Sequence, residues 1–433
     1  MRRIRNVAVG FLCAAALVLT ACSPGDTETA QPTGSSDPRQ GTQELTYLYF
    51  TDGPDEQATR DLIAKYEKEK GVTVKLEIIP YANLEQTLQA RLSGGNAPDV
   101  VRLTSLTNFR EDLLDLNAFQ KEALDGQFIE GFDAAAMGPN GERLAVPSDL
   151  TINGLFVNED QFKKAGVPIP EKGKEWKSWQ EMVDAANKVK KANNTEYAVA
   201  VDVSGHRFST MLSQYGTTLI AEDGKTAAVD QAKTTKMLTD LKKWNSDGTM
   251  PRDLVLQAGS KYKAANEIFL GGQVPVYLSG NWQIGAFNKN ATFGWKAVPN
   301  PCEERCGGFP GGKFMAAFKE SKNPALAAEF VAWMNTTDNQ KQMVAQANFL
   351  PTRSDLLKAD IPYTTRPEDM LVYVNEIEAT PDDTYVSAYS PAFSNSAKAL
   401  VAAIADVLAD KATPEAAAAK LKTDVEGAIK DAG

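Results

Sequence analysis

From residue 45 onward, apolar and polar residues alternate with two different periods. Short apolar runs with a period of about two residues are typical of strands, and a period of about 3.6 residues is typical of helices. Gly71 ends the first helical run, and Asn83 precedes the second as an expected N-cap. This alternation predicts right-handed βαβ units and a parallel sheet. The expected strands span residues 45–50, 72–79 and 99–103, and the expected helices span residues 55–70 and 84–92.

The central and C-terminal parts of the chain are richer in helical patterns. Ser178 and Glu181 form a capping-box motif, and apolar residues follow it at helical spacing. The sequence shows no repeat of fixed period, which argues against solenoids and propellers. Further strands are expected at residues 274–278, 293–298 and 314–318, and further helices at residues 234–244, from Pro324, at 396–410 and after Pro414.

The N-terminus has the order of features found in a secretory signal peptide. Three arginines within the first five residues precede an apolar run, residues 7–21. This run is shorter than the roughly 20 apolar residues that span a bilayer. We therefore expect residues 1–21 to be a signal peptide that the mature protein lacks.

The end of the apolar run, Leu-Thr-Ala-Cys, resembles a bacterial lipobox and predicts that Cys22 is lipidated. Residues 22–43 would then be the lipidated cysteine and a flexible tether, because they are rich in Pro, Gly, Ser and Thr and have no hydrophobic period. Acyl chains hold a soluble domain on a bilayer. The expected location is the extracytoplasmic face of the cell membrane.

Length and charge limit the classes of function. A chain of 433 residues is long for one core and suggests two lobes. The formal net charge is −10, and the sequence shows no basic stripe. Because phosphate contacts need clustered Lys and Arg, nucleic acid is not an expected partner.

The few histidines and cysteines limit the chemistry. His206 is the single histidine, so a His-based zinc site is not expected, and a Ser-His-Asp triad would have to use it without a G-x-S-x-G motif. We expect His206 to be a surface or packing residue. Outside the cytoplasm, Cys302 and Cys306 are expected to form a disulfide. No cofactor and no metal site are expected.

Five segments carry motifs that occur together, and in this order, in one family. They are residues 94–101 (GGNAPDVV), 146–160 (with VPSD and GLFVNED), 269–282 (with FLGGQVPV and SGNW), 311–314 (GGKF) and 349–353 (FLPTR). The set resembles extracellular solute-binding proteins of bacterial ABC importers, in the sugar-binding group that includes maltose-binding protein. The resemblance runs from about residue 45 to the C-terminus.

This resemblance implies an α/β, two-lobed periplasmic-binding-protein fold of the type II kind, with the ligand in a cleft between the lobes. Each lobe is expected to be discontinuous in sequence. Lobe one would comprise residues 44–149 plus 294–340, and lobe two residues 150–293 plus 341–433.

The resemblance also implies a function without chemistry on the ligand. A monomeric binding protein would capture a carbohydrate, a di- or oligosaccharide, by closure of its lobes and deliver it to the membrane permease of the importer. Ligand bridging both lobes would shift the population to the closed form.

A sugar site needs a flat aromatic for the C–H face of the ring and fixed polar groups for its hydroxyls. Such groups are expected where the carboxyl ends of parallel strands converge. Trp282 is the expected stacking residue. The expected ligand-binding residues are Asp52, Arg102, Ser105, Asp149, Asn281, Trp282, Gly311, Gly312 and Arg353.

Several of these residues have a plain structural alternative. The alternatives are core packing for Trp282, a helix N-cap for Asp52, an ion pair for Arg102, hinge packing for Asp149 and a structural contact for Arg353.

Ser148 stands where many relatives carry an aromatic residue, which argues against a second stacking contact at that position.

Three other functions stay open at this point. An extracellular glycoside hydrolase would need two carboxylates on a rigid barrel, and eight regular βα units are not visible. A binding protein for a non-sugar solute, such as a glycerophosphodiester or a polyamine, would keep the same architecture. A structural surface lipoprotein would keep one conformation with every ligand.

Overall fold

The N-terminal part of the folded chain forms the strands and helices that its hydrophobic pattern predicts. Gly71, with a φ of 68°, ends the first helix. The prediction that the Asn83 side chain caps the second helix is wrong. Asn83 is the last residue of a 3-10 turn, its backbone is helical, and its side chain makes no cap bond. The elements are β1 (Glu44–Tyr49), α1 (Asp55–Lys70), β2 (Thr73–Ile78), η1 (Tyr81–Asn83), α2 (Leu84–Ser93) and β3 (Val100–Leu103).

The computed structural model describes residues 43–51, 55–256 and 264–432. The expected signal peptide, Cys22, almost all of the expected tether and Asp52 lie outside these residues. The described residues belong to one compact unit, Thr42–Gly433.

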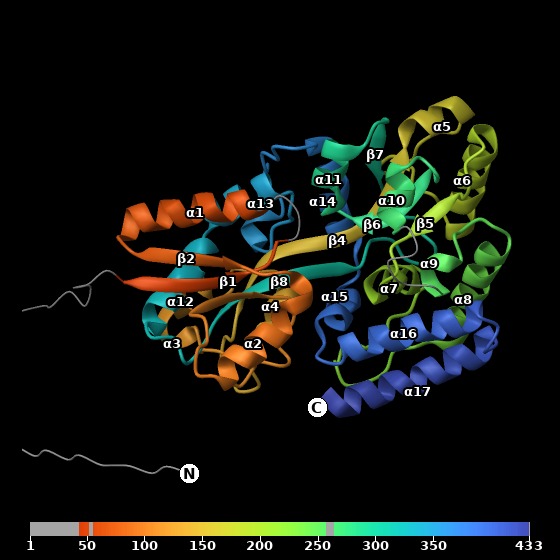
Figure 1. Cartoon of the computed structure of the whole chain (residues 1–433). Helices are drawn as coiled ribbons and strands as arrows, with labels where there is room; N and C mark the ends of the chain where they lie inside the picture. Colours follow the sequence, from red (N-terminus) through yellow and green to blue (C-terminus); the bar gives the residue numbers. More distant parts are fainter. Residues whose placement is uncertain (1–42, 52–54, 257–263, 433) are drawn as a thin grey trace, which may run out of the picture. The chain divides into compact units, whose positions relative to one another are not determined.

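Around β1, β2 and β3 a first set of elements packs, which we call lobe one. Helices α12 and α13 cover this part of the sheet together with α1 (Figure 1). The remaining elements of lobe one are α3 (Asn117–Leu124), α4 (Glu130–Ala135), β8 (Pro310–Ala317), α12 (Pro324–Met334), α13 (Thr337–Ala347) and η2 (Ser354–Leu356).

A second, more helical set of elements forms lobe two. Ser178 caps α6 by accepting from the backbone N–H of Glu181, as the capping-box motif predicts. The strands are β5 (Val199–Val201), β6 (Val276–Gly280) and β7 (Trp295–Val298). The helices are α5 (Glu159–Ala165), α6 (Trp179–Asn193), α7 (Gly205–Gln214), α8 (Gln231–Ser246), α9 (Asp253–Leu256), α10 (Ala265–Leu270), α11 (Gln283–Asn290), α14 (Pro367–Ala379), α15 (Asp382–Tyr389), α16 (Phe393–Leu408) and α17 (Pro414–Ala432).

One long strand, β4 (Val146–Asn158), joins the two lobes and is drawn in yellow in Figure 1. In the described residues the strands form one sheet of order β2-β1-β3-β8-β4-β6-β5, with β7 paired to β4. The first half of β4 pairs with β8, and the second half, from Asn153, pairs with β6 on one edge and, from Leu155, with β7 on the other. The chain therefore passes from lobe one to lobe two along β4 near Asn153.

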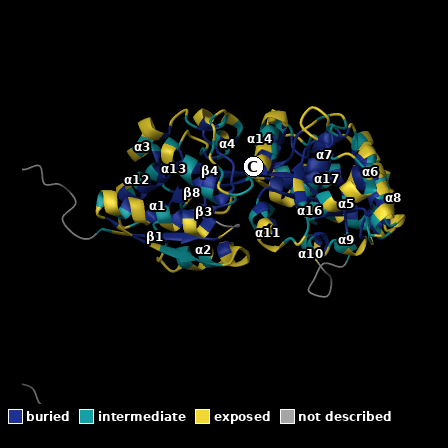
Figure 2. Cartoon of the chain, turned by 90° about the horizontal axis from the view of Figure 1, so that it is seen from above, coloured by how far each residue is buried: buried dark blue, intermediate teal, exposed yellow. Residues whose placement is uncertain are grey.

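Buried residues fill each lobe separately. One cluster lies between the sheet of lobe one and α1, α12 and α13, and another lies among α6, α7, α8, α16 and α17 of lobe two. A third cluster follows the central strands from one lobe to the other. Figure 2 shows these buried positions in dark blue inside both groups, with exposed yellow positions on the outer helix faces.

Two segments lie in a different lobe from the one that the sequence boundaries give. Strand β7, expected in lobe one, pairs with the same half of β4 as β6 does, on the opposite edge of β4. Helix α13 extends to Ala347, beyond the boundary at residue 340, and packs on α1 through the bond from Lys65 to Asn339. These contacts favour boundaries near residue 310 and near residue 350.

Across residues 43–51, 55–256 and 264–432, no helix has both the length and the apolar character needed to cross a membrane.

Candidate functional site

The strand directions bring two sets of strand ends toward one another. Strands β1, β2 and β3 are mutually parallel and run in the direction of β4, because β8 is antiparallel to both β3 and β4. Strands β5 and β6 are parallel to each other and antiparallel to β4. The carboxyl ends of both sets therefore point toward the middle of β4. Ligands of α/β proteins bind at such ends.

The register gives the distance between the two sets. Leu103, the end of β3, is level with Pro147 of β4 through Phe314 of β8. Gly280, the end of β6, pairs with Asn153. Six residues of β4 separate these levels, which corresponds to roughly 20 Å. We call this region the strand-end junction: residues 148–152 of β4, residues 310–313 of β8, and the described residues that directly follow β1, β2, β3, β5 and β6.

Arg102 and Asp149, two expected ligand-binding residues, bind each other. The Arg102 Nη2 lies 3.1 and 3.0 Å from the two carboxylate oxygens of Asp149, and Nη1 donates to the carbonyl of Phe50 at 2.8 Å. Asp55 lies 3.3 Å from the same Nη1. Arg102 is 1% exposed and Asp149 is 2% exposed. Because the pair is buried, it holds the end of β3 against β4 on the lobe-one side of the junction.

The rings around Arg102 add to its fixation. Its guanidinium carbon lies 4.9 Å from the ring centroid of Tyr49, 4.7 Å from that of Phe50 and 5.2 Å from that of Phe349. Cations are attracted to the faces of aromatic rings at these distances. The Tyr49 hydroxyl donates to Asp55 at 2.6 Å, and burial raises the pKa of Tyr49.

Asn281 uses both ends of its amide for the protein. Its Oδ1 accepts from the backbone N–H of Ile152 at 2.9 Å, and its Nδ2 donates to the carbonyl of Asn348 at 2.8 Å. The residue is fully buried. Asn281 thus links β6, β4 and the segment after α13, and the ligand bond expected from the sequence stays a prediction.

Trp282 lies at the end of β6 and is partly exposed. The guanidinium carbon of Arg207 lies 4.6 Å from the centroid of its ring. Arg207 contacts Asp202 at 3.3 Å, and Asp202 also accepts from the hydroxyls of Tyr277 at 2.7 Å and Ser279 at 2.6 Å. An indole, a guanidinium and a carboxylate are thereby collected at the carboxyl ends of β5 and β6.

Asp202 and Arg207 were missed by the sequence reasoning. Arg207 follows Ser204, which caps α7 by accepting from the Arg207 N–H at 3.4 Å. The signal was present, because Asp202 directly follows β5 and Arg207 stands in the first turn of the next helix. The contact between Arg207 and Trp282 could not be predicted from local pattern, because the two residues are 75 positions apart in the sequence.

His206 is a packing residue. Its ring lies 5.8 Å from that of Phe309 and 4.8 Å from that of Phe393. Burial, with the charges of Arg207 and Lys313, lowers the pKa of His206 to about 3. The imidazole is therefore neutral at neutral pH.

On the lobe-one side of the junction, Tyr81 is 58% exposed, and its ring centroid lies 5.0 Å from that of Phe50. Tyr81 was not among the residues predicted from the sequence, although an aromatic three residues beyond a strand end is a recognisable signal. Ser105, an expected ligand residue, is exposed after β3, with its Oγ 3.0 Å from the Oγ1 of Thr107.

Gly311 and Gly312 belong to β8 and pair with Thr151 and Leu150. A Cβ at Gly312 would lie 2.5 Å from the ring of Phe132, so glycine there permits the ring to pack. A Cβ at Gly311 would lie 2.9 Å from the Oγ1 of Thr151. Close packing gives both glycines a role in addition to the amide exposure expected from the sequence.

Arg353 lies outside the junction. Thr352 already reaches the carbonyl of Pro147 at 2.6 Å, and the chain then runs away from the junction. The Arg353 guanidinium binds Asp355 at 3.0 Å and the side chain of Gln127 at 2.7 Å. These contacts match the structural alternative for this residue.

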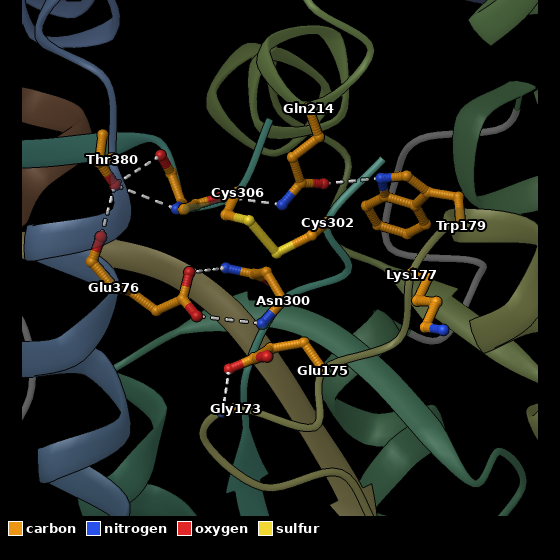
Figure 3. The surroundings of a disulfide bond; sticks show 12 residues. Gly173, Glu175, Lys177, Trp179, Gln214, Asn300, Cys302, Cys306, Glu376 and Thr380 are labelled. Carbon is orange, nitrogen blue, oxygen red and sulfur yellow. Dashed lines mark hydrogen bonds between the residues drawn. A yellow bond between two sulfur atoms is a disulfide. The ribbon is translucent and has the colours of Figure 1, made fainter. Parts of the chain in front are cut away.

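Cys302 and Cys306 form a disulfide in the segment between β7 and β8. Figure 3 shows that Asn300, Glu376, Gln214 and Trp179 surround it. The enclosed loop is also held from outside: the Arg305 guanidinium binds Asp383 at 2.6 Å.

Comparison with known sequences gives the class of the protein. The sequence profile described as bacterial extracellular solute-binding protein matches residues 61–370. This is more than half of the chain, and the chain belongs to that family. Membership places the protein outside the cytoplasm.

The individual proteins that the chain matches have only low sequence identity to it. The galactooligosaccharide-binding protein of Bacillus subtilis is 23% identical over 368 residues, which cover 82% of this chain and 82% of that protein. The GacH receptor of Streptomyces glaucescens, solved without ligand and with acarbose, superposes with a TM-score of 0.75 at 21% identity, covering 90% of this chain and 100% of that chain. The cyclic alpha-maltosyl-1,6-maltose binding protein from Arthrobacter globiformis superposes with a TM-score of 0.74 at 18% identity, with the same coverage. The fold is thus the two-lobed α/β fold expected from the sequence.

Proposed function

We propose that this protein captures a carbohydrate, a disaccharide or an oligosaccharide, at the strand-end junction and delivers it to the permease of an ABC importer. The observation that carries the proposal is the group of Trp282, Arg207 and Asp202. An indole face suits the C–H face of a sugar ring, and the two charged side chains suit neighbouring hydroxyls.

A second aromatic on the opposite side supports a ligand that touches both lobes. Tyr81 follows β2 of lobe one and is exposed, whereas Trp282 follows β6 of lobe two. The levels of the two sets of strand ends differ by roughly 20 Å along β4, which suits an elongated ligand. A ligand that bridges the lobes stabilises their closed arrangement, which a permease then recognises.

The relatives support the same class of ligand. One is named for galactooligosaccharides, and others are a multiple sugar-binding protein of Streptococcus mutans and a diacetylchitobiose binding protein of Streptomyces coelicolor. The proposal assigns no reaction to the protein, because the junction is explained by binding alone.

We also propose that the mature chain is a monomer anchored by a lipid on Cys22. The basis is the Leu-Thr-Ala-Cys motif after an apolar run. The Cys22→Ala variant is expected in the soluble fraction, and the wild-type chain in the membrane fraction with an acyl mass on its first residue. A wild-type chain without added acyl mass would contradict the anchor.

The test of carbohydrate capture is a calorimetric titration with mono-, di- and oligosaccharides. Trp282→Ala and Tyr81→Ala should each weaken binding of a sugar ligand by about ten- to a hundredfold, as the loss of a buried aromatic face predicts. Phe119→Ala is the matched control, since Phe119 is 42% exposed on α3, away from the junction.

Two results would overturn the proposal. Unchanged affinity of Trp282→Ala would show that the sugar does not bind at Trp282. Release of shortened products from an oligosaccharide would show that the protein is a hydrolase.

A further inference from the structure

An open pocket of about 750 Å³ lies in lobe two, outside the strand-end junction. Helix α14, strand β7, the loop of residues 169–175 and the disulfide form its walls. Its apolar wall includes Pro299, Leu371 and Val372. Leu371 is 57% exposed, which makes it one of three large hydrophobic side chains in the described residues that stay open to solvent.

A buried carboxylate lies in the wall of this pocket. Glu376 is only 5% exposed, and its two oxygens accept from the backbone N–H of Asn300 at 3.1 Å and from the Asn300 side chain at 2.7 Å (Figure 3). Both donors are neutral. Among the described residues, no Lys, Arg or His forms an ion pair with Glu376. Burial, the largest cause, together with the neighbouring Glu175 raises the pKa of Glu376 to about 7, against the hydrogen bonds from Asn300, which lower it.

A second acceptor lies beside this carboxylate. The Oδ1 of Asn300 is buried and has no hydrogen-bond partner in the described part of the chain. A buried polar atom without a partner costs free energy, and a donor from outside the chain would satisfy it. The carboxylate and the amide oxygen are together complementary to a ligand group that donates several hydrogen bonds and carries positive charge.

The basic residues of the pocket are already engaged. Arg366 binds Asp369 at 2.6 Å, Lys296 binds Glu159 at 3.3 Å, and Lys172 donates to the side chain of Asn375 at 2.8 Å. Six carboxylates line the pocket against three basic side chains, so the lining carries an excess of negative charge. Within the described residues, no three His, Cys, Asp or Glu side chains are grouped to hold a metal ion. An organic cation fits this lining better than a metal.

We propose that this pocket is a second binding site, which takes a small primary amine with a compact apolar body. Its ammonium group bonds to Glu376 and the Asn300 amide oxygen, and its body covers Leu371, Val372 and Pro299. A charge-assisted bond to a buried carboxylate is the strong contact, and apolar burial adds to it. The site is independent of the proposed carbohydrate site.

The test uses the whole mature chain, with benzylamine as the probe and benzyl alcohol as its neutral counterpart, titrated at pH 8 by NMR. Benzylamine should bind at least tenfold more tightly than benzyl alcohol. Glu376→Gln should weaken benzylamine binding by about ten- to a hundredfold, the range of a hydrogen bond to a charged group. Glu378→Gln is the matched control on the same helix, because the Glu378 side chain is 61% exposed.

A second variant keeps the test decisive if Glu376→Gln disturbs the Asn300 bonds. Leu371→Ser changes only an exposed side chain and should weaken benzylamine binding by a few-fold. Equal binding of the amine and the alcohol, or full affinity in both variants, would overturn the proposal. Carbohydrate titrations separate the two sites: benzylamine should leave sugar affinity unchanged, and Trp282→Ala should leave benzylamine affinity unchanged.

Discussion

Arg102 and Asp149 form an ion pair that is almost completely removed from solvent, with Nη2 3.0 Å from Oδ2 and side-chain exposures of 1% and 3%. The pair connects the end of β3 to the crossing strand β4, shortly before Asn153, near which the chain passes into lobe two. Its charges satisfy each other and hold the base of the strand-end junction in one geometry.

Replacing Arg102 by Met should strongly destabilise the protein. Asp149 and Asp55 would then stay buried without their cation, and removal of one partner of a buried pair costs about 3–5 kcal/mol. The loss should appear as a lower free energy of unfolding in urea. Arg60→Ala is the control, because its partner Glu56 and Arg60 itself are both 48% exposed, and such pairs contribute less than about 1 kcal/mol. A loss below about 1 kcal/mol in Arg102→Met would show that the pair does not hold the junction.

Gly280 is required by its neighbours. A Cβ there would lie 2.1 Å from the ring of Trp282 and 2.7 Å from the carbonyl oxygen of Ile152. Gly280→Ala should lower the free energy of unfolding by about 1–3 kcal/mol, as overpacking does, and it should also weaken sugar binding because the indole must move. Both effects are measurable on one preparation, by urea unfolding and by calorimetry.

Gly427 offers a matched glycine in open space. A Cβ at this position in α17 would meet no atom within 4 Å. Gly427→Ala should raise the free energy of unfolding by about 0.5–1 kcal/mol, the usual helix preference for alanine, and should leave sugar affinity unchanged. Equal effects of Gly280→Ala and Gly427→Ala on the free energy of unfolding would contradict the argument that the neighbours of Gly280 leave no room for a Cβ.

The disulfide should make a modest contribution. Cys302 and Cys306 enclose a loop of five residues, and the chain-entropy relation gives about 2 kcal/mol for a loop of this length. Reduction with dithiothreitol should lower the free energy of unfolding by that amount. The Cys302→Ala/Cys306→Ala variant should show the same loss and no response to dithiothreitol. A wild-type protein equally stable in both conditions would show that contacts such as Arg305 to Asp383 hold the loop alone.

Much of the fold could be predicted from the sequence because its elements are specified locally. Helix α1 has the predicted bounds, since its apolar spacing and Gly71 lie within one segment. The cap at Ser178 follows from two residues three positions apart. Asn83 was wrong as a side-chain cap because the preceding 3-10 turn, which the hydrophobic period does not reveal, gives it helical backbone.

The site was harder to predict because its contacts are distant in sequence. Arg102 and Asp149 are 47 positions apart, and Asn281 and Asn348 are 67 apart. Local pattern places Arg102 at the end of one strand and Asn281 directly after another, but it does not tell whether their polar atoms meet protein or ligand. Trp282 could be selected because it directly follows a strand, whereas Arg207 could be paired with it only from the folded structure.

Glu376 makes stability depend on pH in a direction opposite to that of a salt-bridged carboxylate. Its pKa is raised from 4.5 to about 7 in the folded chain. Between these values the folded state keeps a proton that the unfolded state releases, so the contribution is fully present below pH 4.5 and is lost as the pH rises through 7. Glu376→Gln cannot titrate, and its free energy of unfolding relative to wild type should therefore increase by about 2–3 kcal/mol between pH 5 and pH 8. Urea unfolding at both pH values measures this difference, with Glu378→Gln expected to follow the wild type; parallel pH profiles for Glu376→Gln and wild type would show that this carboxyl is not held protonated by its burial.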